Sequence, residues 1–375
     1  MHVTAFRNLI LAAIAPLVLA TGCTKDDHEC STGPADAAPL GPDASPFGAC
    51  QGDSSPSKKL DILFLVDNSG SMGEEQASLA QNFPKLIEKL RGIQGGLPDL
   101  HIGVISSNLG VEGWNIPGCV SDDGHLQATP RVDGCNAPVG APFIADEIAA
   151  DGTTRVPNFS GTLEDSFACI AQLGTTGCGF ERHLDSLERA LDPSNDFNAG
   201  FLRPDAYLAV VIIADEDDCS ADDGKVFDPS DTSLTGTLGP LESFRCTEFG
   251  VTCAEGDITR EPGAYSGCHP RTDSPYLKDP KVVADFLKSI KCDPEKLLVA
   301  GIIGNATPVK VETADGKPKL APSCSSAANG TADPAVRIDW LLEQFPGSVT
   351  TSICSDDLSP ALTKIAERLA GQVGP

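Results

Sequence analysis

The sequence lacks the motifs that mark several common enzyme classes. It has no His-Glu-x-x-His pair, no Gly-x-Ser-x-Gly elbow, no Gly-x-Gly-x-x-Gly fingerprint and no lysine-bearing phosphate loop. Its six histidines are scattered, and no two cysteines have the Cys-x-x-Cys spacing of a zinc finger. We therefore expect a protein that is not an enzyme, with a hydrolase as the least favoured alternative. His183 and His269 are interpreted as surface or structural residues.

Positive charge is also scarce. The chain has 27 lysines and arginines against 53 aspartates and glutamates, and its formal net charge is −26. This excess of negative charge disfavours nucleic acid and anionic lipid headgroups as partners. Most of the carboxylates are expected to form a solvated surface, and some to hold divalent cations.

The N-terminal hydrophobic run is too short to cross a membrane. It extends from Leu9 to Ala20 behind a single Arg7, a pattern typical of a secretory leader. The residues Ala20-Thr21-Gly22-Cys23 resemble a bacterial lipobox, which implies a signal peptide over 1–22 and a lipid anchor on Cys23. Ordinary cleavage near Gly22 is the alternative. Threonine rather than aspartate after Cys23 favours the outer membrane of a diderm bacterium, with the lipid as the only membrane contact.

Residues 23–58 and the cysteine content fit an exported chain. Pro, Ala, Ser, Gly and Asp dominate 23–58, which predicts a flexible tether behind the lipidated residue. The fourteen cysteines indicate an oxidising compartment and disulfide bonds. Lipidation of Cys23 would leave an odd number, so one cysteine would be free or bonded to another chain. The connectivity stays open, and the local candidates are Cys30 with Cys50, Cys119 with Cys135, and Cys169 with Cys178.

Helical and strand patterns alternate along the rest of the chain. Alternating elements of this kind predict an α/β fold with a doubly wound, mostly parallel sheet. Residues 142–145 are a weak candidate for one antiparallel edge strand, and Pro84 predicts a kink or a late start in the first helix. The fold is expected over 59–371, with disulfide-rich loop insertions at about 109–163, 219–277 and 305–333. The expected strands are 60–66, 100–105, 208–214, 297–303 and 349–353, and the expected helices are 74–93, 167–173, 184–191, 279–291, 334–345 and 359–369.

Oxygen-bearing side chains follow two of these strands. Asp67 ends the first strand and begins the segment Asp67-Asn68-Ser69-Gly70-Ser71-Met72, while Asp215 ends the strand at 208–214. A Gly-x-Thr turn at 174–176 leads into another helix. Because the carboxyl ends of parallel strands meet at one edge of a sheet, these residues are expected to lie together. The simpler alternative is a Ser/Gly turn with an N-capping aspartate.

The Asp-x-Ser-x-Ser pattern resembles the metal-ion-dependent adhesion site of von Willebrand factor A (VWA) domains. The resemblance covers roughly Lys58 to Leu369. It implies that Ser69, Ser71 and Thr176 coordinate Mg²⁺, Ca²⁺ or Mn²⁺ directly, with Thr175 as the alternative to Thr176, and that Asp67 and Asp215 act largely through water. The loop after Asp215 departs from the family's usual Thr-Asp-Gly, because Glu216, Asp217 and Asp218 follow. These loops also look like those of exported, cysteine-rich lipoproteins often met in myxobacteria.

The resemblance implies a binding function. In VWA domains a carboxylate from a protein partner completes the coordination of the ion, so we expect a cell-envelope lipoprotein that binds a protein partner in this way. The alternative is a structural envelope protein in which Ca²⁺ serves stability alone. The three insertions leave from the carboxyl ends of strands, so they are expected to surround the same edge of the sheet.

Overall fold

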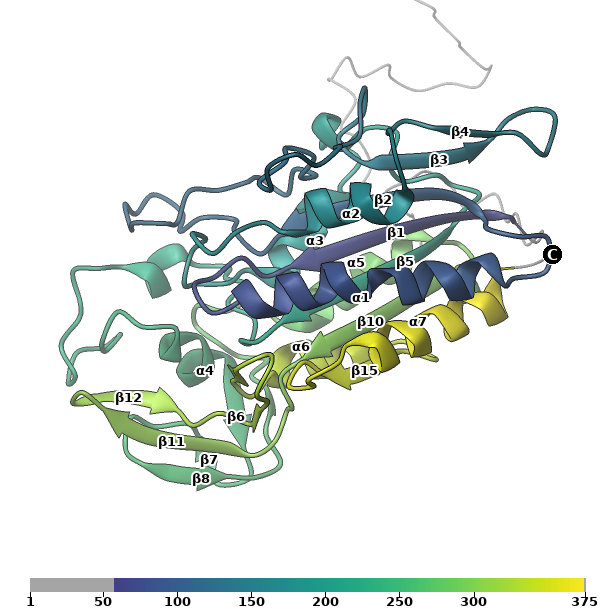
Figure 1. Ribbon diagram of the computed structural model, residues 1–375. Helices are drawn as coiled ribbons and strands as arrows, with labels where there is room; N and C mark the ends of the chain where they lie inside the picture. The colour runs from purple at the N-terminus through teal and green to yellow at the C-terminus, as the bar shows by residue number, and fades with distance from the viewer. Residues whose placement is uncertain (1–56, 374–375) are drawn as a thin grey trace, which may run out of the picture. The chain divides into compact units, whose positions relative to one another are not determined.

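The computed structural model describes residues 57–373. Its main sheet has seven strands in the order β15-β10-β5-β1-β2-β3-β4 (Figure 1). The five strands from β15 to β2 run parallel, β3 is antiparallel to β2, and β4 is antiparallel to β3. The expected doubly wound, mostly parallel sheet with an antiparallel edge is thus confirmed. The strands are β1 (Lys59–Val66), β2 (Asp99–Ser106), β3 (Ile144–Ile148), β4 (Arg155–Pro157), β5 (Tyr207–Ala214), β10 (Leu297–Ile303) and β15 (Val349–Ser352).

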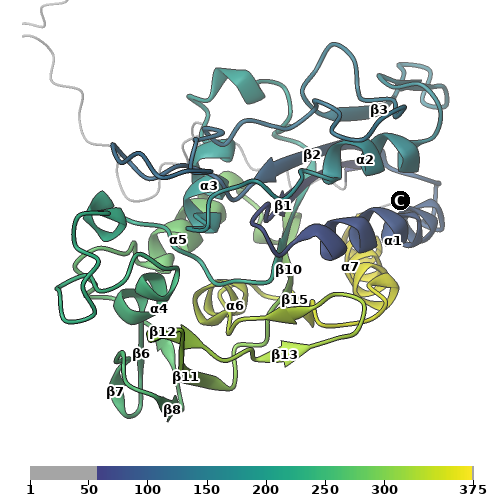
Figure 2. The same cartoon turned by 60° about the vertical axis from the view of Figure 1, so that its left-hand side comes forward.

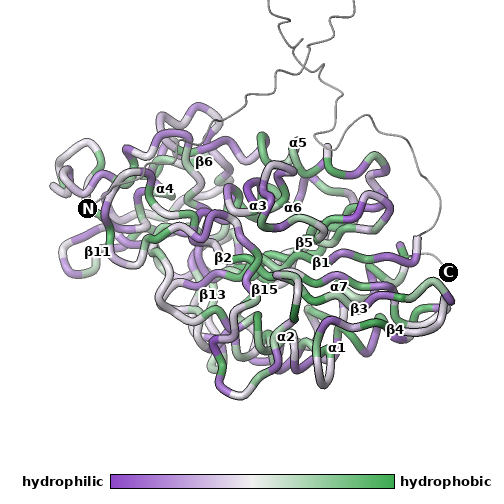
Figure 3. Tube along the Cα trace, turned by 90° about the horizontal axis from the view of Figure 1, so that it is seen from above, coloured by the Kyte–Doolittle hydropathy of each residue, from purple (hydrophilic) through white to green (hydrophobic). Residues whose placement is uncertain are grey.

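Helices of the described chain cover both faces of this sheet. Because residues in a strand alternate between the two faces, β1 contributes to two separate cores. Ile62 and Phe64 belong to one core, and Leu63 and Leu65 to the other. Figure 3 shows the central strands as the most hydrophobic part of the trace. The first core is covered by α1 (Gly73–Arg91), α2 (Leu163–Ala171) and α7 (Ser359–Gln372), and the second by α3 (His183–Leu191), α5 (Pro280–Ile290) and α6 (Val336–Glu343).

Several element boundaries follow from local caps. The Asp279 carboxylate accepts a hydrogen bond from the Lys281 backbone N–H at 2.9 Å, so α5 begins where the sequence predicts. Helix α2 begins earlier than expected, at Leu163, because the Thr162 hydroxyl caps it. Pro84 predicted a kink or a late start of the first helix; the late start is wrong, because α1 begins at Gly73 and includes Pro84.

The second and third insertions build small sheets that the sequence did not predict. Most of their strands have only two or three residues, too few for a hydrophobic period to be recognised. In Figures 1 and 2 these strands and α4 gather at the end of the main sheet where α1 begins, which is the carboxyl edge of its parallel strands. The elements are α4 (Phe244–Gly250), β6 (Val251–Cys253), β7 (Gly256–Asp257), β8 (Gly263–Tyr265), β9 (His269–Pro270), β11 (Val309–Ala314), β12 (Lys317–Leu320), β13 (Cys324–Ser325) and β14 (Thr331–Ala332).

The disulfides differ from the local pairs that the sequence suggested. The pairs Cys119 with Cys135 and Cys169 with Cys178 are wrong, because each cysteine bonds across to the other segment. These two disulfides join the first insertion to α2 and to the turn that precedes α3. They stabilise a segment whose own few apolar residues cannot form a core. Cys292 is also disulfide-bonded. The disulfides described in full are Cys119–Cys178, Cys135–Cys169, Cys219–Cys246, Cys253–Cys268 and Cys324–Cys354.

Several expectations lie outside the described residues. These are the signal peptide at 1–22, nearly all of the tether at 23–58, the lipidated Cys23, and the pair Cys30 and Cys50. Within 57–373, no helix is both long enough and apolar enough to cross a membrane. The disulfides of the described part fit an exported protein that folds outside the reducing cytoplasm.

Candidate metal centre

Two buried aspartates end neighbouring parallel strands. Asp67 follows β1 and Asp215 follows β5, and the Asp67 backbone N–H continues the ladder by donating to the Ile213 carbonyl at 2.9 Å. Asp67 is 0% exposed and Asp215 is 3% exposed. Parallel pairing of two apolar strands therefore places both carboxylates at one edge of the sheet.

The serine turn organises one side of the Asp67 carboxylate. Asp67 Oδ1 accepts hydrogen bonds from the Ser69 backbone N–H at 2.8 Å and from the Ser107 hydroxyl at 3.3 Å. The hydroxyl oxygens of Ser69 and Ser71 lie 3.3 Å apart. Asp67 Oδ2 is buried and makes no hydrogen bond with any described residue. One carboxylate oxygen thus holds the turn, and the other makes no hydrogen bond but lies 3.5 Å from His183 Nε2.

Gln76 brings the threonine turn to the Asp67 loop. Its side-chain N–H groups donate to the Asp67 carbonyl at 2.9 Å and to the Gly174 carbonyl at 3.0 Å, and its Oε1 accepts from the Gly174 N–H at 3.0 Å. Gly177 N–H donates to the Asn68 carbonyl at 2.9 Å. A Cβ at Gly177 would lie 2.4 Å from Asn68 Oδ1, so only glycine permits this approach.

The structure therefore brings together the three segments that carry the candidate ligands. Thr175 and Thr176 are both exposed on the turn, and neither hydroxyl makes a hydrogen bond within 57–373. Thr176 therefore stays the predicted ligand, with Thr175 as the alternative. The Cys119–Cys178 disulfide holds the turn from its other side.

The electrostatics of this edge disfavour negative charge in the absence of a cation. Burial, with Asp67 and Glu216 nearby, raises the pKa of Asp215 to about 9, although a hydrogen bond from Ser71 opposes the rise. Burial also raises the pKa of Glu75 to about 7, helped by Glu74 and Asp67. A divalent ion at the site would reverse this balance, because it stabilises the ionised carboxylates.

The donor atoms fit a hard divalent cation. Asp67 Oδ2 and Asp215 Oδ1 are buried oxygens without a hydrogen-bond partner in the described chain, and the serine hydroxyls lie beside them. All the candidate ligands are oxygens, which suits Mg²⁺, Ca²⁺ or Mn²⁺ rather than zinc or copper. Nowhere in 57–373 do three or more His, Cys, Asp or Glu side chains converge as a metal cluster. The candidate set contains only two such residues, because its other ligands are hydroxyls.

Sequence reasoning missed two residues beside Asp67. His183 is not a surface residue: it is 0% exposed, and its Nε2 lies 3.5 Å from Asp67 Oδ2. Burial alone would lower the pKa of His183, but Asp67, Asp218 and Asp217 outweigh it and raise the pKa. Glu75 is 1% exposed. Its spacing from Leu79 and Phe83 along the buried face of α1 was the available signal.

The crowded acids after Asp215 have separate roles. Asp217 accepts hydrogen bonds from the first backbone N–H groups of α6, at 3.0 Å from Arg337 and 3.2 Å from Ile338. Asp218 pairs with the Arg337 side chain at 2.9 Å. Both carboxylates therefore anchor structure, which leaves Asp215 as the aspartate of this loop that serves as a candidate ligand beside Asp67.

Comparison with known proteins gives distant structural likeness alone. No family model matches the chain, and no curated protein matches its sequence. The conserved hypothetical protein BatB from Bacteroides thetaiotaomicron has a TM-score of 0.31 at 9% identity, over 84% of this chain and 98% of that one. The pilus adhesin RrgA from Streptococcus pneumoniae has a TM-score of 0.30 at 11% identity, over 85% of this chain and 44% of that one. The human COPII-coat protein Sec24c has a TM-score of 0.31 at 11% identity, over 85% of this chain and 32% of that one.

Proposed function

We propose that this chain is a VWA-type binding protein with a metal-ion-dependent adhesion site, and not an enzyme. Ser69, Ser71 and Thr176 would hold Mg²⁺, Ca²⁺ or Mn²⁺ directly, with Asp67 and Asp215 acting largely through water. The observation that carries the proposal is the pair of buried carboxylates on adjacent strand ends, in which Asp67 Oδ2 and Asp215 Oδ1 make no hydrogen bond within 57–373. Unsatisfied buried carboxylate oxygens are costly, and a bound cation removes that cost.

The ion would supply an electrophilic position for a carboxylate of a protein partner. Residues of this chain would position the ligands: Asp67 Oδ1 fixes the serine turn, and Gln76 holds the threonine turn beside it. Because hydroxyls contribute more ligands than carboxylates, the ion would keep enough positive charge to attract an acidic partner.

We place this function in the cell envelope. The leader and lipobox support export and a lipid on Cys23, and the disulfides support an oxidising compartment. The anchor would hold the protein at the outer membrane of a diderm bacterium. Replacing Cys23 with Ser should release the protein from the membrane fraction while the folded domain is unchanged.

Titration calorimetry of the oxidised mature chain with Mg²⁺, Ca²⁺ and Mn²⁺ tests the metal site. Binding should be lost in Asp67→Ala and strongly weakened in Thr176→Ala, while Thr153→Ala, an exposed threonine in another turn, should bind as the wild type does. A greater loss of metal affinity in Thr175→Ala than in Thr176→Ala would make Thr175 the ligand in place of Thr176. Absence of binding in the wild type would refute the proposal.

A second measurement separates adhesion from a purely structural ion. An acidic peptide, or a protein captured from envelope extract, should bind in the presence of the metal and dissociate when EDTA is added. If the metal raises the unfolding temperature but creates no affinity for an acidic ligand, Ca²⁺ serves stability alone.

A further inference from the structure

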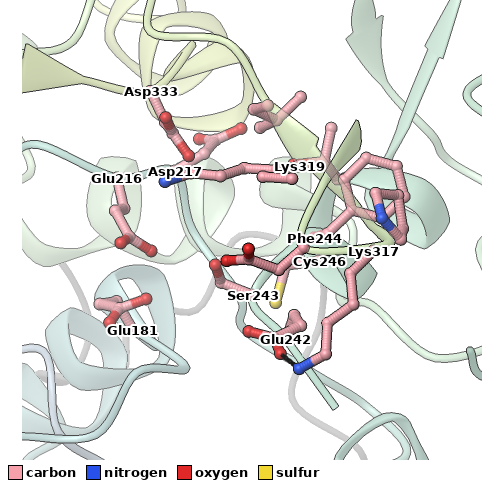
Figure 4. A pocket seen from close by; sticks show the side chains of 15 residues that line it. Glu181, Glu216, Asp217, Glu242, Ser243, Phe244, Cys246, Lys317, Lys319 and Asp333 are labelled. Carbon is pink, nitrogen blue, oxygen red and sulfur yellow. Dashed lines mark hydrogen bonds and ion pairs between the residues drawn. The ribbon is translucent and has the colours of Figure 1, made fainter. Parts of the chain in front are cut away.

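A cavity of about 350 Å³ lies beside the candidate metal centre. It is enclosed by the loop after β5, the start of α4, and β12, so the second and third insertions both contribute to it (Figure 4). Acidic groups dominate one side, which Glu181, Glu216 and Asp333 line. Phe244, Pro318 and Leu320 provide apolar wall.

Glu181 forms the floor of this cavity. The residue is 1% exposed, and neither of its carboxylate oxygens has a hydrogen-bond partner among the described residues. Figure 4 shows the Glu216 carboxylate close to that of Glu181, on the same side of the cavity. Within residues 57–373, no ion pair within 4.0 Å joins Glu181 or Glu216 to a basic side chain.

The lysines at the cavity do not neutralise these two acids. Lys317 forms an ion pair with Glu242 at the rim. Lys319 extends toward Asp333 in Figure 4, yet across residues 57–373 no ion pair within 4.0 Å joins it to a carboxylate. The Lys319 ammonium thus approaches the acidic side without an ion pair, and a cation from outside would displace it.

The shape of the cavity favours an organic cation over a second metal ion. Ca²⁺ takes about six or more oxygen ligands, whereas no cluster of three acidic, histidine or cysteine ligands occurs in the described chain. A volume of about 350 Å³ also exceeds the need of one ion. Apolar walls above an acidic floor match a side chain with a methylene stem and a charged end.

We propose that this cavity receives an arginine or lysine side chain from a protein partner, with Glu181 and Glu216 as its counter-charges. The stem would lie against Phe244 and Leu320, and Lys319 would withdraw from the acidic side. This inference deepens the proposed function. It rests on that function only for the identity of the partner, and not for the binding of the side chain. The same partner would offer an acidic group to the metal and a basic group to the cavity.

The test uses small probes without a carboxylate, so that the metal centre does not contribute. Nα-acetyl-arginine methylamide is titrated into the oxidised mature chain in EDTA and followed by NMR, with the isosteric but neutral citrulline analogue as its control. The arginine probe should bind at least about tenfold more tightly than the citrulline probe, because only the charged end pairs with the floor. Equal binding of the two probes, or no binding, would overturn the inference without requiring any variant to fold.

Variants locate the binding. Glu181→Gln and Glu216→Gln should each weaken the arginine probe by about tenfold, whereas Glu312→Gln, an exposed glutamate on β11 outside the cavity, should not. Glu181→Gln should keep or raise the unfolding temperature, since the carboxyl group that it replaces is buried and makes no hydrogen bond within 57–373. Unchanged probe affinity in both cavity variants would place the binding elsewhere.

Two further outcomes separate this inference from the proposed function. Asp67→Ala should lose Mg²⁺ binding and keep the arginine probe; the probe binding without any Mg²⁺ binding in the wild type would refute only the metal centre. Competition between Ca²⁺ and the arginine probe in Asp67→Ala would show that the cavity is a second metal site, which would overturn the cationic side-chain proposal.

Discussion

Arg337 and Asp218 form an ion pair in which both side chains are 0% exposed, with Arg337 Nη2 lying 2.9 Å from Asp218 Oδ2. The pair joins the first turn of α6 to the loop that follows Asp215. Asp218 also accepts hydrogen bonds from the Leu184 N–H at 3.0 Å and from the Ser220 hydroxyl at 2.6 Å. The loop that carries the candidate metal ligand is thereby fixed to both α3 and α6, which pack on the same face of the sheet.

Replacing Arg337 with Met should lower the free energy of unfolding by about 3–5 kcal/mol, because the change leaves the buried Asp218 carboxylate without its cation. Urea denaturation measures this loss. The matched control is Lys281→Met, which breaks the exposed pair with Asp285 and should leave the unfolding midpoint nearly unchanged. Equal losses of unfolding free energy in the two variants would show that burial does not make the Arg337–Asp218 pair more important for stability than an exposed pair.

Replacing Gln76 with Leu should weaken metal binding without removing any proposed ligand. The variant loses the three hydrogen bonds that hold Gly174 and the Asp67 carbonyl together. We expect about a tenfold loss of Mg²⁺ affinity and a loss of about 2–3 kcal/mol in stability, at about 1 kcal/mol per hydrogen bond. Calorimetry and urea denaturation measure the two effects. Gln372→Leu, which removes one bond to the Glu295 carbonyl, is the control. Wild-type Mg²⁺ affinity in Gln76→Leu would show that the threonine turn is not part of the site.

The stability of the metal-free protein should fall as the pH rises. The pKa of Asp215 is raised to about 9 and that of Glu75 to about 7, chiefly by burial. Between about pH 4 and about pH 9 the folded state therefore holds protons that the unfolded state has released, so the free energy of unfolding decreases with pH. A divalent cation competes with these protons, and its stabilising effect should grow over the same range.

Thermal unfolding in EDTA and in Mg²⁺ tests this linkage. The Mg²⁺-induced rise in Tm should be larger at about pH 8 than at about pH 5, and the difference should vanish in Asp67→Ala. A Mg²⁺ effect that is greatest at the acidic end would contradict the assignment of carboxylates to the site.

Removing the Cys119–Cys178 disulfide should affect both stability and the metal site. The two cysteines are 59 residues apart, and chain-entropy reasoning gives a loss of about 4 kcal/mol for the double Cys→Ala variant. Removing Cys253–Cys268, with a separation of 15, should cost about 3 kcal/mol. Only the first variant should lose Mg²⁺ affinity, since Cys178 lies two residues after Thr176. Equal Mg²⁺ affinities would show that this disulfide does not position the turn.

Local signals in the sequence were sufficient for the central architecture. The apolar run at 297–303 matches β10 at both ends, and the Asp279-Pro280 pair marks the start of α5. These elements are determined by residues close together in the chain: the strand by its continuous burial on both faces, the helix by its cap. Asp67 and Asp215 could likewise be placed at one edge, because parallel strands leave little choice about where their carboxyl ends lie.

Tertiary structure alone decided which distant groups face one another. Asp218 meets Arg337 across 119 residues, and Cys135 bonds to Cys169 rather than to its nearer neighbour Cys119. Asp217 and Glu216 are adjacent acids in the sequence and both line a cavity, yet only Asp217 also caps α6. The charge, partner and exposure of such side chains depend on the packing of separate insertions, for which no local period exists. The sequence by itself therefore determined the sheet and the position of its polar edge, and the packing of the insertions decided which acids remain free to bind.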